Sequence, residues 1–105
     1  PFELVDDDAA KYPRASYMKD FIGKKVTMLG YHVTQKPVRT IHGDTMSFGT
    51  FMDVHLDWID TVHFPEVHRK NPMYSGFYRI TGTVVEEFSF CSIEVIDIEK
   101  IGIKR

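Results

Sequence analysis

The stretch TMSFGTFMD at residues 45–53 has the character of a β-strand, with two aromatic side chains among small and β-branched ones. Successive side chains of a strand point to opposite faces of its sheet. If Phe51 points inward, Ser47 and Gly49 point inward with it. The outward face then carries Met46, Phe48 and Thr50. Small residues inside and a large aromatic outside serve a core poorly, so the pattern predicts a binding role for Phe48. A bulge that reversed the alternation would instead make Phe48 a core residue.

Four other segments share this strand character. The strands are predicted at residues 25–33, 45–53, 58–64, 76–85 and 91–98, with a short helix at 66–71. Gly30 and Gly82 lie inside two of these segments, where a glycine marks a bulge or a sharp bend. The connections at 34–44 and 86–90 are expected to be loops, and 54–57 a tight turn. The spacing leaves no room for parallel βαβ units.

Five short strands within about 80 residues must protect both edges of their sheet. A closed antiparallel barrel does so, and a helix between the third and fourth strands is typical of the oligonucleotide-binding (OB) fold. The sequence therefore predicts an all-β, five-stranded Greek-key OB-fold barrel. Residues 1–23 are expected to be a lead-in from a preceding domain, and residues 24–105 the barrel itself.

The charge of the chain is unevenly distributed. The net charge of −2 argues against a wholly electrostatic nucleic-acid binder. Residues 11–40, however, carry seven basic side chains against one acid, and residues 41–68 carry five acids and no Lys or Arg. Such polarity permits phosphate contact on one side of the molecule. An ordinary solvated surface would show the same pattern.

Nothing in the sequence indicates a membrane or secreted protein. There is no apolar run of about 20 residues and no signal-peptide pattern. The single cysteine, Cys91, cannot form an internal disulfide and suits a reducing compartment. We therefore expect a cytoplasmic location. Because the chain begins at Pro1 and stops after a strand-like run, we expect it to be a fragment of a larger protein.

Several motifs bear on the family. They are an apolar strand with an internal Gly, a basic segment ending at Gly, a Met-x-Phe-x-Thr-x-x-Asp strand, a Phe-Pro junction and a second strand Gly. In this chain these are Val26, Gly30, Gly43, Met46, Phe48, Thr50, Asp53, Phe64, Pro65 and Gly82. With the opening Pro-Phe-Glu-Leu, this pattern resembles the OB-fold domain near the C-terminus of the bacterial DNA polymerase III alpha subunit. The resemblance covers residues 1–5 and 24–103. The commonest form has Leu where Phe51 stands, an apolar-for-apolar change.

The resemblance implies a module that binds single-stranded DNA during replication, within a bacterial DNA-directed DNA polymerase, a nucleotidyltransferase. Its partners would be single-stranded DNA, other domains of the polymerase and replisome subunits, with no membrane and no small-molecule substrate. Two alternatives stay open. The acidic balance and the short loop at 86–90 favour an OB domain that docks proteins, and the fold motif equally fits an anticodon-type RNA binder.

Binding of single strands combines cationic side chains for phosphates with aromatic faces for bases. The candidate nucleic-acid-binding residues are Lys36, Arg39, Phe48, Thr50, Trp58 and Asp60. Phe48 matches the position of a base-stacking Phe in synthetase anticodon domains. Lys36 and Arg39 are placed in the loop at 34–44, where they would meet phosphates or simply be solvated. Trp58 and Asp60 share the outward face at 58–64 if Ile59, Thr61 and His63 point inward. The indole would stack on a base or cover one end of the barrel.

Two aromatic residues near the predicted fifth strand, Phe88 and Phe90, would clamp a base or pack on the parent polymerase. His63, Glu66 and His68 are the nearest approach to a metal cluster, but their spacing matches no zinc pattern. No catalytic motif accompanies Cys91, and no phosphate-binding loop is present. We therefore expect no catalytic residue, no metal and no cofactor in this chain.

Overall fold

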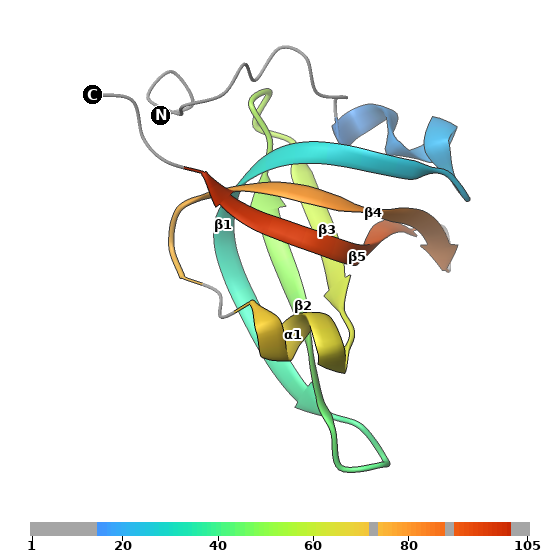
Figure 1. The fold of residues 1–105 in the computed structure, drawn as a ribbon. Helices are drawn as coiled ribbons and strands as arrows, with labels where there is room; N and C mark the ends of the chain where they lie inside the picture. The colour runs from blue at the N-terminus through green and yellow to red at the C-terminus, as the bar shows by residue number, and fades with distance from the viewer. Residues whose placement is uncertain (1–14, 72–73, 88–89, 102–105) are drawn as a thin grey trace.

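The computed structural model describes residues 15–71, 74–87 and 90–101, and within them five strands form a closed barrel in the order β1-β2-β3-β5-β4 (Figure 1). The elements are the 3-10 helix η3 (Ala15–Phe21), β1 (Lys25–Arg39), β2 (Thr45–Met52), β3 (Trp58–His63), α1 (Pro65–Lys70), β4 (Phe77–Glu87) and β5 (Phe90–Ile101). Neighbouring strands are antiparallel except β3 and β5, whose parallel pairing closes the barrel. The predicted all-β OB-type barrel, with its helix between β3 and β4, is confirmed.

β1 bends so strongly that its two halves belong to different parts of the barrel (Figure 1). Its first half pairs with β4 and its second half with β2. Gly30 lies before this change of partner, where an added Cβ would be 2.9 Å from Cβ of Phe51. The predicted bend at Gly30 therefore reflects close packing on the core. A bulge lies three residues later, where the β1–β2 register shifts between His32 and Thr34.

The prediction that the first strand ends at Val33 is wrong, because β1 continues to Arg39. Residues 34–39 remain paired with β2 and make a long two-stranded ribbon with it. Proline has no backbone N–H to donate to a neighbouring strand. It is therefore tolerated in an edge strand, where one side of the strand has no partner. Among the described residues this half of β1 pairs with β2 alone, so Pro37 lies in such an edge.

The second glycine-marked irregularity lies in β4. The β4–β5 register shifts between Thr81 and Gly82, and Gly82 lies opposite Val26 of β1. The expected meeting of the two glycine-containing strands is thus confirmed. The expected loop at 86–90 is shorter than predicted, because β4 extends to Glu87 and β5 begins at Phe90.

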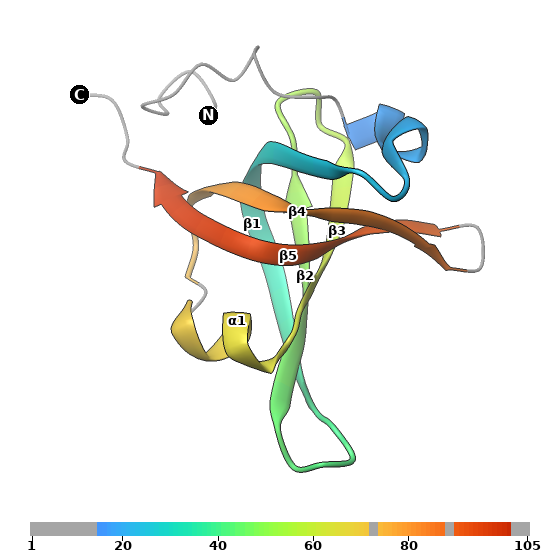
Figure 2. The same ribbon diagram turned by 45° about the vertical axis from the view of Figure 1, so that its right-hand side comes forward.

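The core fills the barrel from the inward positions of every strand. Its fully buried apolar side chains are Met28, Phe51, Ile59, Ile80, Val84 and Ile93. η3 adds Met18 and contacts β1, β3 and β4. η3 and α1 lie at opposite ends of the barrel (Figures 1 and 2). The described part of the predicted lead-in, from residue 15 onward, therefore packs on the barrel, and its first 14 residues lie outside the described part.

α1 begins at Pro65, whose fixed φ and missing N–H suit the first position of a helix. The helix spans Pro65–Lys70, one residue earlier than predicted at each end. Glu66 lies in its first turn and accepts a hydrogen bond from Lys70 Nζ at 3.0 Å. Val67 packs against the core and His68 bonds to β2, so one side of this short helix is held by the barrel.

Candidate nucleic-acid interface

The alternation predicted for β2 is confirmed. Ser47, Gly49 and Phe51 are buried inside the barrel, whereas Phe48 points outward and keeps 46% of its surface exposed. On β3, Ile59, Thr61 and His63 are buried and Trp58 is 57% exposed, again as predicted. The outer face of β2 and β3 therefore displays large aromatic side chains that the core does not use.

Gly49 shows why β2 carries small residues inside. A Cβ at this position would lie 2.5 Å from Oγ1 of Thr61 and 2.7 Å from Oε1 of Gln35. Both neighbours are inward-facing polar side chains of the adjacent strands. Gly49 is thus required by the interior, and Phe48 beside it is free to serve the outer face.

A row of outward-facing residues crosses the barrel at Phe48. Lys36 of β1 lies opposite Phe48, Phe48 lies opposite Val62 of β3, and Val62 lies beside Glu94 of β5. Directly paired residues share one face of a sheet. The row therefore places a cation, an aromatic ring, an aliphatic side chain and a carboxylate next to one another.

A groove of about 220 Å³ lies over the β2, β3 and β5 members of this row. It is lined by Met46, Phe48, Val62, Phe64, Val85, Ser92 and Glu94. Its floor is mostly apolar, and two of its walls are the half-exposed rings of Phe48 and Phe64. This groove is the place on the outer face where a flat apolar group, such as a base, would find two aromatic neighbours.

Phe64 was not among the predicted site residues. It follows β3 directly and precedes Pro65, so its backbone is extended at the start of α1. The Phe-Pro junction in the sequence was the available signal, since a proline restrains the residue before it to extended conformations.

Thr50 and Asp60 form the next row of the same face, where they lie opposite each other. Trp58 lies one row further, opposite Met52. Four residues separate Phe48 from Met52, so the Phe48 and Trp58 rows are about 13 Å apart along the strands. With Lys36, five of the six predicted site residues thus occupy a single outer face, with Phe48 and Trp58 at different levels.

The two predicted basic residues do not lie in a loop. Lys36 and Arg39 are both in β1, and this expectation is wrong because the β1–β2 ribbon extends past the barrel. Lys36 is paired with Phe48 and Arg39 with Thr45, and Phe48 and Thr45 occupy opposite faces of β2 by alternation. Of these two basic residues, only Lys36 therefore shares the outer face with Phe48.

Of the two aromatic residues expected before the fifth strand, Phe90 is the first residue of β5 and is highly exposed. Phe88 lies outside the described residues. Phe90 is therefore available for contact with a ligand or with another protein surface.

A polar network occupies the α1 end of the barrel interior. Gln35 Nε2 donates to Ser47 Oγ at 2.6 Å, and Ser47 Oγ lies 3.0 Å from His68 Nδ1 of α1. Gln35 Oε1 lies 3.1 Å from His32 Nε2. The helix is thus joined to β1 and β2 through a chain of side-chain hydrogen bonds.

His63 belongs to the same interior and is completely buried. Its Nε2 lies 2.8 Å from Oγ1 of Thr61, while no hydrogen-bond partner for its Nδ1 exists among the described residues. Burial, with the nearby charges of His32 and His68, lowers the pKa of His63 from 6.5 to about 4. The imidazole is therefore neutral at physiological pH.

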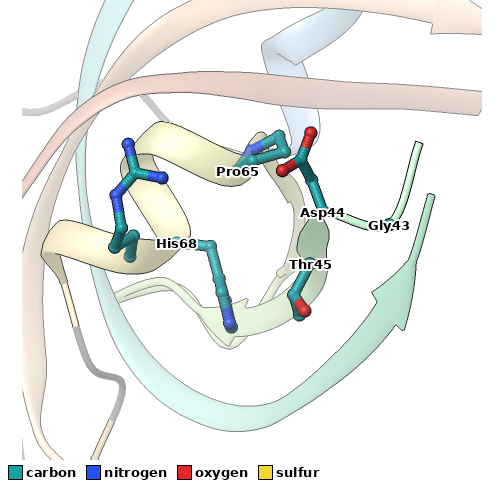
Figure 3. A pocket seen from close by; sticks show the side chains of 6 residues that line it. Gly43, Asp44, Thr45, Pro65 and His68 are labelled. Carbon is teal, nitrogen blue, oxygen red and sulfur yellow. The ribbon is translucent and has the colours of Figure 1, made fainter.

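A second, larger hollow lies between the turn that joins β1 to β2 and helix α1. This cleft of about 600 Å³ is lined by Gly43, Asp44, Thr45, Pro65, His68 and Arg69. Figure 3 shows His68 reaching from α1 toward the strand that carries Thr45, with Asp44 and Pro65 on the other side of the hollow. The cleft joins segments about 20 residues apart in sequence, and no local pattern indicated it.

Within residues 15–71, 74–87 and 90–101, no three His, Cys, Asp or Glu side chains are grouped so that they could hold a metal ion. His68 bonds to Ser47 and Glu66 to Lys70, so the sequence neighbours of His63 have other partners. In the same part of the chain, no helix has the length and apolar character needed to cross a membrane.

The chain was compared with known protein families and with curated proteins, and neither comparison found a match.

Proposed function

We propose that this barrel is a single-stranded nucleic-acid-binding module with no catalytic role of its own. One observation carries the proposal, namely the outward, half-exposed ring of Phe48 at the centre of the β2–β3 face. Base stacking on such a ring contributes about 1–3 kcal/mol per base without regard to sequence. Lys36 is paired directly with Phe48, and in this proposal it binds the phosphate of the stacked nucleotide.

The biological setting is proposed from the motifs rather than from the geometry. The Met-x-Phe-x-Thr-x-x-Asp strand and the Phe-Pro junction resemble the OB domain of the bacterial DNA polymerase III alpha subunit. Both motifs contribute to the groove, through Met46, Phe48 and Phe64. We therefore propose single-stranded DNA as the ligand, held near a replicative polymerase active site on other domains of a longer chain.

A protein-docking role is the second candidate, and a specific feature favours it. Asp60 and Glu94 share the outer face with Phe48, and each would repel a phosphate placed near it. An apolar groove flanked by both signs of charge also suits a peptide segment with an apolar side chain and a basic neighbour.

A fluorescence-anisotropy titration with oligo-dT at two salt concentrations distinguishes these candidates. For the proposed function, the domain binds oligo-dT and the affinity falls as salt rises, because phosphate binding releases counterions. Absence of salt-sensitive binding would overturn the proposed function and favour the protein-docking role. Circular dichroism of the same samples verifies that the barrel is folded.

A further inference from the structure

The cleft between α1 and the β1–β2 turn has walls of opposite charge. Asp44 lines it from the turn and Arg69 from the helix. Among the described residues, neither side chain takes part in an ion pair or a side-chain hydrogen bond. The lining of the cleft therefore includes a carboxylate residue from the turn and a guanidinium residue from the helix, together with Pro65 and His68 of α1.

The interior network determines how His68 meets this space. An amide oxygen only accepts hydrogen bonds, so Gln35 Oε1 accepts from His32 Nε2–H and its NH₂ group donates to Ser47 Oγ. Ser47 Oγ also lies 3.0 Å from Nδ1 of His68, so this ring nitrogen is engaged by the barrel. Nε2 is then the ring nitrogen of His68 that remains for a ligand in the cleft.

The cleft combines donors from α1 with an acceptor from the turn, and bases differ in how well they match this arrangement. Guanine carries two acceptors, N7 and O6, on one edge, and Arg binds them in bidentate fashion. Its Watson–Crick edge adds two adjacent donors, N1–H and the N2 amino group, which one carboxylate accepts together. Thymine and uracil have a single N–H, and adenine and cytosine donate through one amino group.

We propose that the cleft lined by Asp44, His68 and Arg69 is a guanine-selective subsite. The proposal rests on the proposed function, in that the guanine would belong to the single strand bound by the barrel. Asp44 would accept from N1–H and N2, and Arg69 with His68 would donate to N7 and O6. The cleft opens on the face of β2 that carries Thr45, opposite to Phe48, so it is separate from the stacking groove.

The test compares oligonucleotides of about 15 nucleotides, long enough for an OB barrel. One is all thymine, one has a single central guanine, and one has inosine there, which lacks the N2 amino group. We expect the guanine oligonucleotide to bind about tenfold more tightly than oligo-dT, with most of this gain lost for inosine. Equal affinity for the guanine and inosine oligonucleotides would overturn the proposal.

Two variants assign the effect to the cleft. Asp44→Asn should abolish the preference for guanine over inosine, because an amide offers one acceptor oxygen in place of two and carries no negative charge. Asp20→Asn makes the same change of charge at an exposed position of η3, at the other end of the barrel, and should keep the preference. An unchanged preference in Asp44→Asn would place the guanine elsewhere and refute the subsite.

Two further measurements complete the test. One compares RNA with DNA as the source of the guanine, and the other tests the cleft even if the proposed function fails. Oligo-rU with a single guanine tests RNA against DNA. If oligo-dT does not bind at all, the proposed function fails, but 5′-GMP added to ¹⁵N-labelled protein still tests the cleft. Shifts of the backbone amides of Gly43, Asp44 and Thr45 with 5′-GMP, and not with 5′-AMP, would support the subsite. Unmoved amides would overturn it.

Discussion

Lys36 of β1 lies directly opposite Phe48 of β2, on the outer face of the barrel. The first half of β1 points its even-numbered residues inward, among them Met28 and His32. The bulge at Val33 reverses this phase, so that Gln35 turns inward and Lys36 outward. Lys36 and Phe48 therefore share the outer face only because one residue is left out of the ladder.

Phe48→Ala should weaken binding of oligo-dT by about 1–3 kcal/mol, because a stacked base loses its aromatic partner. The salt dependence should remain, since no charge is removed. Anisotropy at two salt concentrations measures both. Tyr74→Ala is the matched control, because this exposed aromatic lies outside the β2–β3 face and its backbone bonds to Tyr78 do not need its ring. If both variants bind like the parent chain, bases stack elsewhere.

Lys36→Ala should reduce the slope of log K against log salt by about 0.7, the value for one lost single-strand phosphate contact. Arg39→Ala should change the slope less, because Arg39 is on the opposite face of the β1–β2 ribbon. The two variants remove the same charge from the same strand, so each is the other's control. A larger effect at Arg39 would show that the bound single strand crosses the face of the ribbon that carries Arg39.

The stability of the barrel should fall when the pH is lowered from about 6.5 to about 4, and level off below. Over this range the unfolded chain protonates His63 while the folded state keeps it neutral, so protons favour unfolding. The difference between the two pKa values corresponds to about 3 kcal/mol. Urea unfolding across this range measures it.

His63→Gln should remove most of that pH dependence, because an amide fits beside Thr61 without titrating. His42→Gln changes an exposed histidine of the β1–β2 turn and should keep the parent's behaviour. A His63→Gln protein that loses stability with acid as steeply as the parent would assign the effect to other groups.

Gly49→Ala should destabilise the fold by roughly 1–3 kcal/mol, the usual cost of overpacking an interior. The added methyl group would meet Thr61 and Gln35, whose polar atoms belong to the buried network. Thermal unfolding followed by circular dichroism measures the loss. Thr50→Ala, one residue along on the outer face, should change stability much less. Equal stability of both variants would mean that the buried hydrogen-bond network makes room for the added methyl group without loss of free energy.

Much of the fold could be predicted because it depends on local pattern. The alternation around Phe51 predicted the correct faces of β2, and the alternation around Ile59 those of β3. Pro65 with Pro72 delimited a helix correct to within one residue. The length of β1 could not be predicted. A proline such as Pro37 normally indicates that a residue run is not a central strand. Here it is accommodated because the second half of β1 lies at an edge.

The sequence by itself determined which residues of β2 and β3 face the core, because alternation is a property of every extended chain and small interior residues reveal its phase. Tertiary structure alone decided which cation accompanies Phe48, since the bulge at Val33 depends on how β1 turns from β4 to β2. It also decided the cleft, which Asp44 and Arg69 line together. The cleft depends on the packing of α1 against the β1–β2 ribbon, through contacts between residues that are distant along the chain.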